Sequence, residues 1–118
     1  MAGKEPEIIE RLAHIVTAIG DVFDFTGAMD FEMFIEDRKT KLAVEKAFEI
    51  IGEATYKLPK EFKARHKGIE WRQMETTRHI LVHNYYEVLP EILWNVKEVY
   101  LTDLRTKVER LIKTLEEE

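Results

Sequence analysis

Apolar residues recur along this chain at steps of three and four positions, the spacing that places side chains on one face of an α-helix. Near the N-terminus this repeat predicts a first helix with apolar positions at Ile8, Leu12, Ile15, Ile19, Val22 and Phe23. Thr26-Gly27-Ala28 then breaks the pattern, and Asp30 is a good N-cap for a second helix. No alternating, strand-like segment is found, so the pattern favours an all-α fold.

The second helix is predicted from about Phe31 to Leu58. Its expected buried positions are Phe34, Ile35, Leu42, Phe48, Ile51 and Leu58. Pro59 suits the first turn of a short third helix that ends near His66, because proline is tolerated where the backbone N–H is unpaired.

A fourth helix is predicted from about Glu70 to Tyr86, and Pro90 opens a final helix. The core positions expected in the final helix are Ile92, Leu93, Val96, Val99, Leu104, Val108, Leu111 and Ile112. These segments predict an up-and-down bundle of four to five helices with short connections. Trp71 and Trp94 lie near the starts of two helices and are expected to be core or interface anchors.

The composition narrows the class of protein. A length of 118 residues fits a single domain over residues 1–118, and the absence of cysteine excludes disulfides, thiolate nucleophiles and cysteine-bound zinc. No apolar run approaches the roughly 20 residues that span a bilayer. The N-terminal ten residues carry acids and Pro6 where a signal peptide needs cations and then an apolar stretch. We therefore expect a cytoplasmic protein that does not associate with membranes.

The net charge of −5 is unevenly distributed. Residues 1–37 carry nine acids and two bases, a net −7, so the remainder carries +2. Within the remainder, one acid, Glu61, stands among five cations, which are Lys57, Lys60, Lys63, Arg65 and Lys67. Such a patch can steer a phosphate backbone to an acidic protein, and we predict an RNA-binding role for it. A solvated surface stretch explains the same residues equally well.

The strongest candidate for chemistry is the motif R-x4-H-x-Y, formed by Arg78, His83 and Tyr85. Arginine is a permanent cation that can bind phosphate through a fork of N–H groups, and histidine moves protons near neutral pH. The two together suffice for metal-free cleavage of a phosphodiester. The spacing alone is equally compatible with a surface arginine and a histidine at a helix C-terminus, where a cation is favoured.

Arg78 and His83 are separated by about 140° of rotation on a straight helix, so they do not lie side by side on one face. Either the helix loosens near Val82, or the two groups approach one phosphate from different angles. A third possibility is that two copies of the helix meet at a two-fold axis. The last possibility predicts a two-fold dimer.

His79 and His83 are four residues apart, with Glu75 and Glu87 about one turn to either side. This spacing allows a metal site on one helix face. Three convincing ligands are nevertheless hard to assign, so we expect no metal.

Glu53 follows Gly52 on the apolar late part of the second predicted helix. Glycine costs helix stability relative to alanine, by about 1 kcal/mol, so its presence indicates a close approach of another helix. A carboxylate at that crossing would hold an arginine or a backbone donor. An exposed acid is the alternative.

Four features in this order resemble the HepT proteins of the HEPN superfamily, over nearly all of residues 37–115. They are EIIGEA at residues 49–54, Ile69-Glu70-Trp71, the R-x4-H-x-Y motif and the helix that contains Leu93-Trp94. The resemblance implies a HEPN helical bundle, usually a two-fold dimer, with metal-independent endoribonuclease activity. His79 departs from the family pattern, in which a polar Asn or Asp follows the arginine.

The resemblance also implies roles for the motif residues. Arg78 and His83 match the catalytic pair of the family, and Tyr85 matches the tyrosine to which an MntA-type nucleotidyltransferase antitoxin adds AMP. His79 and Glu53 are candidate supporting residues, and no cofactor is implied. The alternative function is a non-catalytic nucleotide- or substrate-binding partner subunit of a small nucleotidyltransferase, which the acidic N-terminal third favours.

Overall fold

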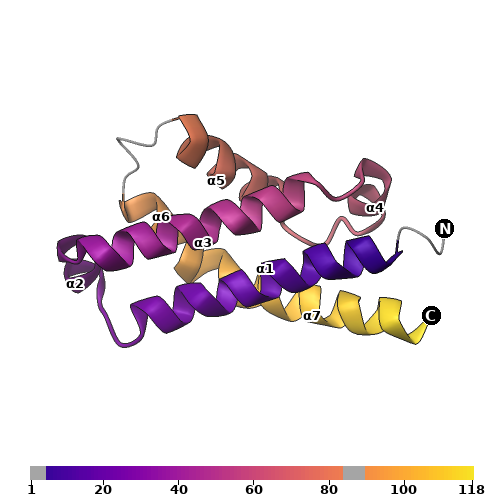
Figure 1. Cartoon of the computed structure of the whole chain (residues 1–118), viewed down its shortest axis with the longest axis horizontal. Coiled ribbons are helices and arrows are strands. Elements are labelled where there is room, and N and C mark those ends of the chain that lie inside the picture. Colours follow the sequence, from indigo (N-terminus) through magenta and orange to yellow (C-terminus); the bar gives the residue numbers. More distant parts are fainter. Residues whose placement is uncertain (1–4, 84–89) are drawn as a thin grey trace.

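The computed structural model describes residues 5–83 and 90–118, which are almost entirely helical. Its elements are α1 (Glu5–Thr26), α2 (Phe31–Glu36), α3 (Arg38–Tyr56), α4 (Lys60–Arg65), α5 (Trp71–His83), α6 (Pro90–Val96), the π-helical turn η1 (Lys97–Leu101) and α7 (Thr102–Glu117). The long helices α1, α3, α5 and α7 alternate in direction along the longest axis (Figure 1). The predicted all-α, up-and-down bundle is therefore confirmed.

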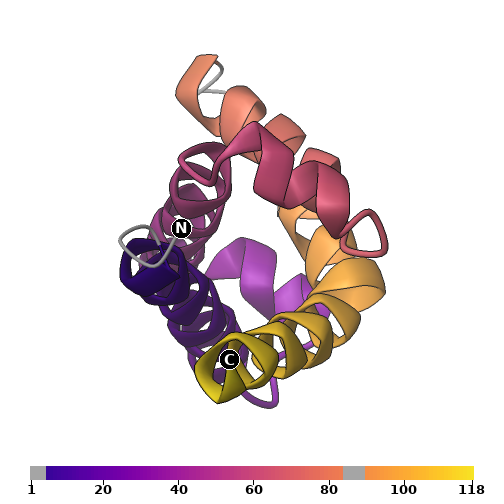
Figure 2. The same cartoon turned by 90° about the vertical axis from the view of Figure 1, so that its right-hand side faces the viewer.

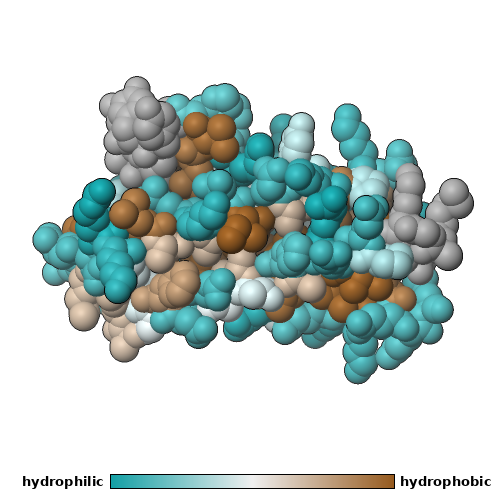
Figure 3. All heavy atoms as spheres, in the orientation of Figure 1, coloured by the Kyte–Doolittle hydropathy of each residue, from teal (hydrophilic) through white to brown (hydrophobic). Residues whose placement is uncertain are grey.

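The helices surround one apolar core (Figure 2). Helix α3 packs against α1 on one side and α5 on the other, and α7 packs against α1. The largest fully buried side chains include Phe34, Phe48, Leu12, Ile15, Ile19, Ile51, Met74, Leu101 and Leu104. Helix α5 lies at the edge of the bundle, and Thr76, His79 and His83 on its outer face are exposed. Most side chains on this side of the molecule are hydrophilic (Figure 3).

The prediction of one continuous second helix was wrong, because the segment is divided into α2 and α3 at Asp37. The Asp37 carboxylate accepts a hydrogen bond from the Thr40 backbone N–H at 2.9 Å and caps α3. The Asp37 N–H donates to the carbonyl of Phe34, which ends α2. This break resets the helical phase. Leu42, expected in the core, is 49% exposed, and Val44 is buried instead.

The predicted final helix contains the π-helical turn, which the apolar spacing did not reveal. A π turn inserts an extra residue, so the side chains that follow are rotated relative to a regular α-helix. Val99, expected in the core, is consequently 58% exposed, whereas Leu101 is fully buried. The turn also buries Lys97, whose ammonium lies 3.6 Å from the centroid of the Trp94 ring and 3.3 Å from the Glu98 carboxylate.

Trp71 belongs to the core, because only 6% of its surface is exposed. Its indole N–H donates to the carbonyl of His66 at 3.0 Å, and its ring packs near Phe62. Of the two expectations for Trp71, a core anchor or an interface anchor, its burial supports the core anchor. No helix in the described ranges 5–83 and 90–118 is long and apolar enough to cross a membrane.

Candidate active site

The candidate site is built where α5 crosses α3, and Gly52 makes that crossing possible. A Cβ atom added at Gly52 would overlap the Cβ of Arg78 and lie 3.1 Å from the carbonyl oxygen of Met74. Only glycine lets the two backbones come this close without displacing Arg78. The close helix approach predicted from the sequence at Gly52 is confirmed.

Arg78 is anchored to α3 through one edge of its guanidinium. Its Nε donates a 2.8 Å hydrogen bond to the Glu53 carboxylate, and its guanidinium carbon lies 4.9 Å from the centre of the Tyr56 ring. Within residues 5–83 and 90–118, the structure gives the two terminal amino groups of Arg78 no hydrogen-bond partner. The Arg78 side chain is 28% exposed, so these groups can reach an anion from solvent.

Glu53 has the features of a residue that positions Arg78. The hydrogen bond from Arg78 lowers the pKa of the Glu53 carboxyl below its ordinary value of 4.5, and Lys57, 3.3 Å away, adds to this effect. The Glu53 carboxyl is therefore ionised at neutral pH. The expectation that a carboxylate at this crossing holds an arginine is confirmed, and its role in catalysis stays a prediction. The contribution of Tyr56 was missed, although its place three residues after Glu53 puts both on one helix face.

His79 and His83 lie together on the outer face of α5. Their ring centroids are 4.2 Å apart, and both residues are exposed. In the described part of the chain, no hydrogen bond joins Arg78 to His83. One copy of the chain thus brings together two separate pairs, Arg78 with Glu53 and His79 with His83, as the rotation of about 140° between Arg78 and His83 requires.

The described residues contain no group of three metal-ligating side chains. Glu75, considered above as a possible ligand beside the histidines, accepts a 3.1 Å hydrogen bond from Lys63 instead. Tyr85 and Glu87 lie outside the described residues, so the position of the tyrosine relative to His83 stays a prediction.

The five cations of the predicted RNA-binding patch do not all line one pocket. Lys57 pairs with Glu53, and Lys63 is only 13% exposed because its ammonium binds Glu75 and the carbonyl of Thr55. Lys60 and Lys67 line one hollow, whereas Arg65 lines a different pocket.

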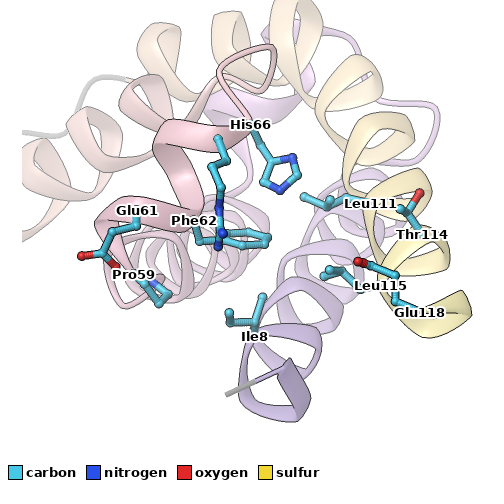
Figure 4. Close-up of a pocket in the computed structure, with 10 residues that line it drawn as sticks. Ile8, Pro59, Glu61, Phe62, His66, Leu111, Thr114, Leu115 and Glu118 are labelled. Carbon is cyan, nitrogen blue, oxygen red and sulfur yellow. The ribbon is translucent and has the colours of Figure 1, made fainter. Parts of the chain in front are cut away.

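The pocket that Arg65 lines has a volume of about 560 Å³ and lies between α1, α4 and α7 (Figure 4). Its walls include Phe62, His66 and Leu111. Burial, together with the nearby charge of Arg65, lowers the pKa of His66. None of Arg78, His79 and His83 lines this pocket, so it is separate from the candidate site.

The family described as "Ribonuclease HepT-like" matches residues 15–111, and the chain belongs to this family. The matched region contains the Glu53–Arg78 pair and both motif histidines. The resemblance to HepT and the expectation of an RNA-cleaving enzyme are confirmed at the level of the family.

The similar proteins cover most of this chain. A protein of Thermococcus cleftensis named "Probable ribonuclease HepT" is 40% identical over 88% of this chain and 94% of its own length. A candidate RNase of Methanocaldococcus jannaschii is 34% identical over 91% of this chain and 88% of its own. A candidate RNase of Caldanaerobacter subterraneus is 29% identical over 86% and 91% of the two chains. No solved structure matches this chain.

Proposed function

We propose that this chain is a metal-independent endoribonuclease in which Arg78 and His83 are the catalytic residues. The observation that carries the proposal is the hydrogen bond by which Glu53 of α3 anchors Arg78 of α5. The exposed His79–His83 pair lies on α5 as well. A cation held by one edge presents its remaining N–H groups in a fixed direction, which is what recognition of a phosphate requires.

The chemistry follows from these groups. Neutral His83 takes the proton from an RNA 2′-hydroxyl, whose oxygen attacks the adjacent phosphorus. The bond from phosphorus to the 5′-oxygen breaks, and the products are a 2′,3′-cyclic phosphate and a 5′-hydroxyl. Arg78 binds the non-bridging oxygens and stabilises the charge of the transition state. His79, or His83 of a second copy, protonates the leaving oxygen. DNA lacks the 2′-hydroxyl and is not cleaved.

We further propose that the protein is the toxin of a pair with an MntA-type nucleotidyltransferase antitoxin. In this proposal the single domain of residues 1–118 forms a two-fold dimer and acts on RNA in the cytoplasm. The antitoxin transfers AMP from ATP to the Tyr85 hydroxyl, with release of pyrophosphate, and thereby silences the nuclease. The support is the family match, which covers the position of Tyr85.

Cleavage of RNA by the purified protein in the presence of EDTA tests the activity. We expect cleavage to persist and to leave cyclic-phosphate ends. Arg78→Ala and His83→Ala should each reduce the rate by about 10²-fold or more without unfolding the protein. Loss of cleavage on chelation, with recovery on adding zinc or manganese, would contradict the proposal and favour a metal site at His79 and His83.

The second candidate function is a non-catalytic partner subunit that binds a nucleotide or substrate for a nucleotidyltransferase. The net charge of −7 over residues 1–37 favours it, because acidic surfaces repel RNA. This candidate predicts stable binding to the nucleotidyltransferase with no cleavage of RNA by the chain alone, whether or not Arg78 is present.

A further inference from the structure

A hollow of about 520 Å³ lies between α4 and the N-terminal half of α5, outside the candidate active site. Lys60, Lys63, Lys67, Ile69, Trp71, Arg72 and Glu75 line it. Four cations therefore face one carboxylate, a formal excess of three positive charges on a protein whose net charge is −5.

One of the four cations is already neutralised. The Lys63 ammonium binds Glu75 at 3.1 Å and the carbonyl of Thr55 at 3.1 Å, and this arrangement ties α4 to α3 and α5. The internal pair uses the single carboxylate of the hollow. Lys60, Lys67 and Arg72 are exposed, and their charges are left to attract an anion from solvent.

The hollow is continuous with the outer face of α5. Arg72, Thr76, His79 and His83 follow one another at steps of three and four residues, so they share one helix face, and all four are exposed. The distance from Arg72 to His83 along the helix is about 16 Å, from a rise of 1.5 Å per residue. A chain of phosphates that crosses His79 and His83 can therefore extend along α5 into the hollow.

We infer that Lys60, Lys67 and Arg72 form a binding subsite for the RNA phosphate backbone, a few nucleotides away from the bond that is cleaved. The inference rests on the proposed ribonuclease function. Compared with the five cations predicted from the sequence, the subsite adds Arg72 and leaves out Lys57, Lys63 and Arg65. Because the subsite is remote from the reacting atoms, it increases the affinity for long RNA and leaves the chemical step unchanged.

The test measures binding and cleavage separately. Binding is followed by fluorescence anisotropy with a 2′-O-methyl RNA of about twelve nucleotides, which has no attacking hydroxyl and cannot be cleaved. The triple variant Lys60→Gln, Lys67→Gln, Arg72→Gln should raise the Kd about tenfold or more at low salt. It should also reduce the slope of log Kd against log salt concentration by about 2, since each lost phosphate contact contributes roughly 0.7.

A matched control changes the same number and type of residues elsewhere. Arg38, Lys39 and Lys113 are exposed and lie outside the hollow, so their triple change to glutamine removes the same charge. This control should leave the salt slope within experimental error of the unaltered protein. The hollow variant should lose more of its cleavage activity on a cleavable twelve-nucleotide RNA than on a dinucleotide, which is too short to reach the hollow.

The outcomes separate the two proposals. Normal cleavage by the hollow variant, with unchanged affinity and salt slope for the twelve-nucleotide RNA, overturns the subsite and leaves the ribonuclease proposal standing. Weakened RNA binding by the hollow variant, in a protein that never cleaves RNA, supports the subsite and overturns the nuclease. If the unaltered protein binds no RNA, both proposals are wrong.

Discussion

At the residue scale, Glu53 holds Arg78 by the Nε edge and sets the direction in which the rest of the guanidinium points. Replacing Glu53 with glutamine keeps the size of the side chain and removes its charge. We expect Glu53→Gln to lower RNA cleavage roughly tenfold, mainly through kcat, because a misaligned cation stabilises the transition state less well. Glu49→Gln is the control, since Glu49 pairs with Lys46 and not with Arg78. Equal kinetics for Glu53→Gln and the unaltered protein would contradict a positioning role.

The same pair predicts a pH dependence of stability. Arg78 depresses the pKa of Glu53 in the folded chain below 4.5, so the folded state resists protonation more than the unfolded state does. The stabilisation by Glu53 is therefore complete above about pH 4.5 and is lost as the pH falls through the depressed pKa. Denaturant unfolding at pH 7 and pH 3 should show a smaller acid-induced loss of stability in Glu53→Gln. An unchanged loss would mean that Glu53 and Arg78 do not pair in solution.

Gly52 offers a test of the helix crossing itself. In Gly52→Ala the new methyl group overlaps Arg78, so α3 and α5 must separate, and we expect a cost of about 1–3 kcal/mol together with loss of cleavage. Gly20→Ala is the matched control, because Gly20 lies within α1 with open space at its Cβ position. That control should stabilise the protein by up to about 1 kcal/mol. Chemical denaturation of both variants checks the comparison, and stabilisation by Gly52→Ala would contradict the close crossing.

At the element scale, the helical spacing predicted the long helices and most of the core, and it failed where a local feature shifts the helical phase. The only sign of the break at Asp37 in the sequence is one residue that can cap a helix, within a long periodic segment. Helix propensity alone does not decide whether the helix breaks there. The π turn is harder to recognise. The buried residues Val96 and Leu101 are five positions apart, which is the mark of the π turn. Val99, three positions after Val96, has the spacing of a buried residue in a regular α-helix, and it is exposed.

In the candidate site, too, some contacts could be predicted from the sequence and others could not. The pairing of Glu53 with Arg78 could be anticipated, because Gly52 marked a close crossing of two helices. The pairing of Lys63 with Glu75 could not be anticipated, because the two residues are twelve positions apart and lie on different helices. Long-range polar contacts depend on how helices are placed in space, and spacing along the chain does not encode that placement.

The cap of α3 gives a prediction at this scale. Asp37→Ala removes the acceptor for the Thr40 N–H at the start of the helix that carries Glu53, and we expect a loss of about 1 kcal/mol of stability. Asp37→Ser retains a capping oxygen and should lose much less. Urea denaturation distinguishes the two variants. Equal stability for both would show that the division between α2 and α3 does not depend on this cap.

At the scale of the whole molecule, one chain keeps Arg78 against α3 and His83 on the outer face of α5, so we expect each active site to draw on two copies. Mixing the inactive variants Arg78→Ala and His83→Ala tests this arrangement. Half of the dimers formed at random are mixed, and each holds one intact pair, so about a quarter of the unaltered activity should return. Light scattering checks that both variants are dimers. No recovery from a mixture shown to contain mixed dimers would argue against shared sites.

The proposed silencing of the nuclease by AMP concerns the catalytic site as a whole. Tyr85 follows His83 by two residues in the sequence, so we expect AMP attached to its hydroxyl to place a bulky anion near the catalytic groups. We expect that anion to compete with RNA phosphate for Arg78 and to block entry to the site, without displacing a catalytic residue. Co-expression with an MntA-type nucleotidyltransferase should therefore add AMP to Tyr85 and abolish RNA cleavage.

The adjacent tyrosine provides the internal control for this mechanism. Tyr85→Phe should keep the fold and much of the nuclease activity and should escape neutralisation, because it lacks the acceptor oxygen. Tyr86→Phe should be modified and silenced like the unaltered protein. Mass spectrometry of peptides from the co-expressed protein locates the modification. AMP found on Tyr86, or on neither tyrosine, would mean that a different contact silences the nuclease.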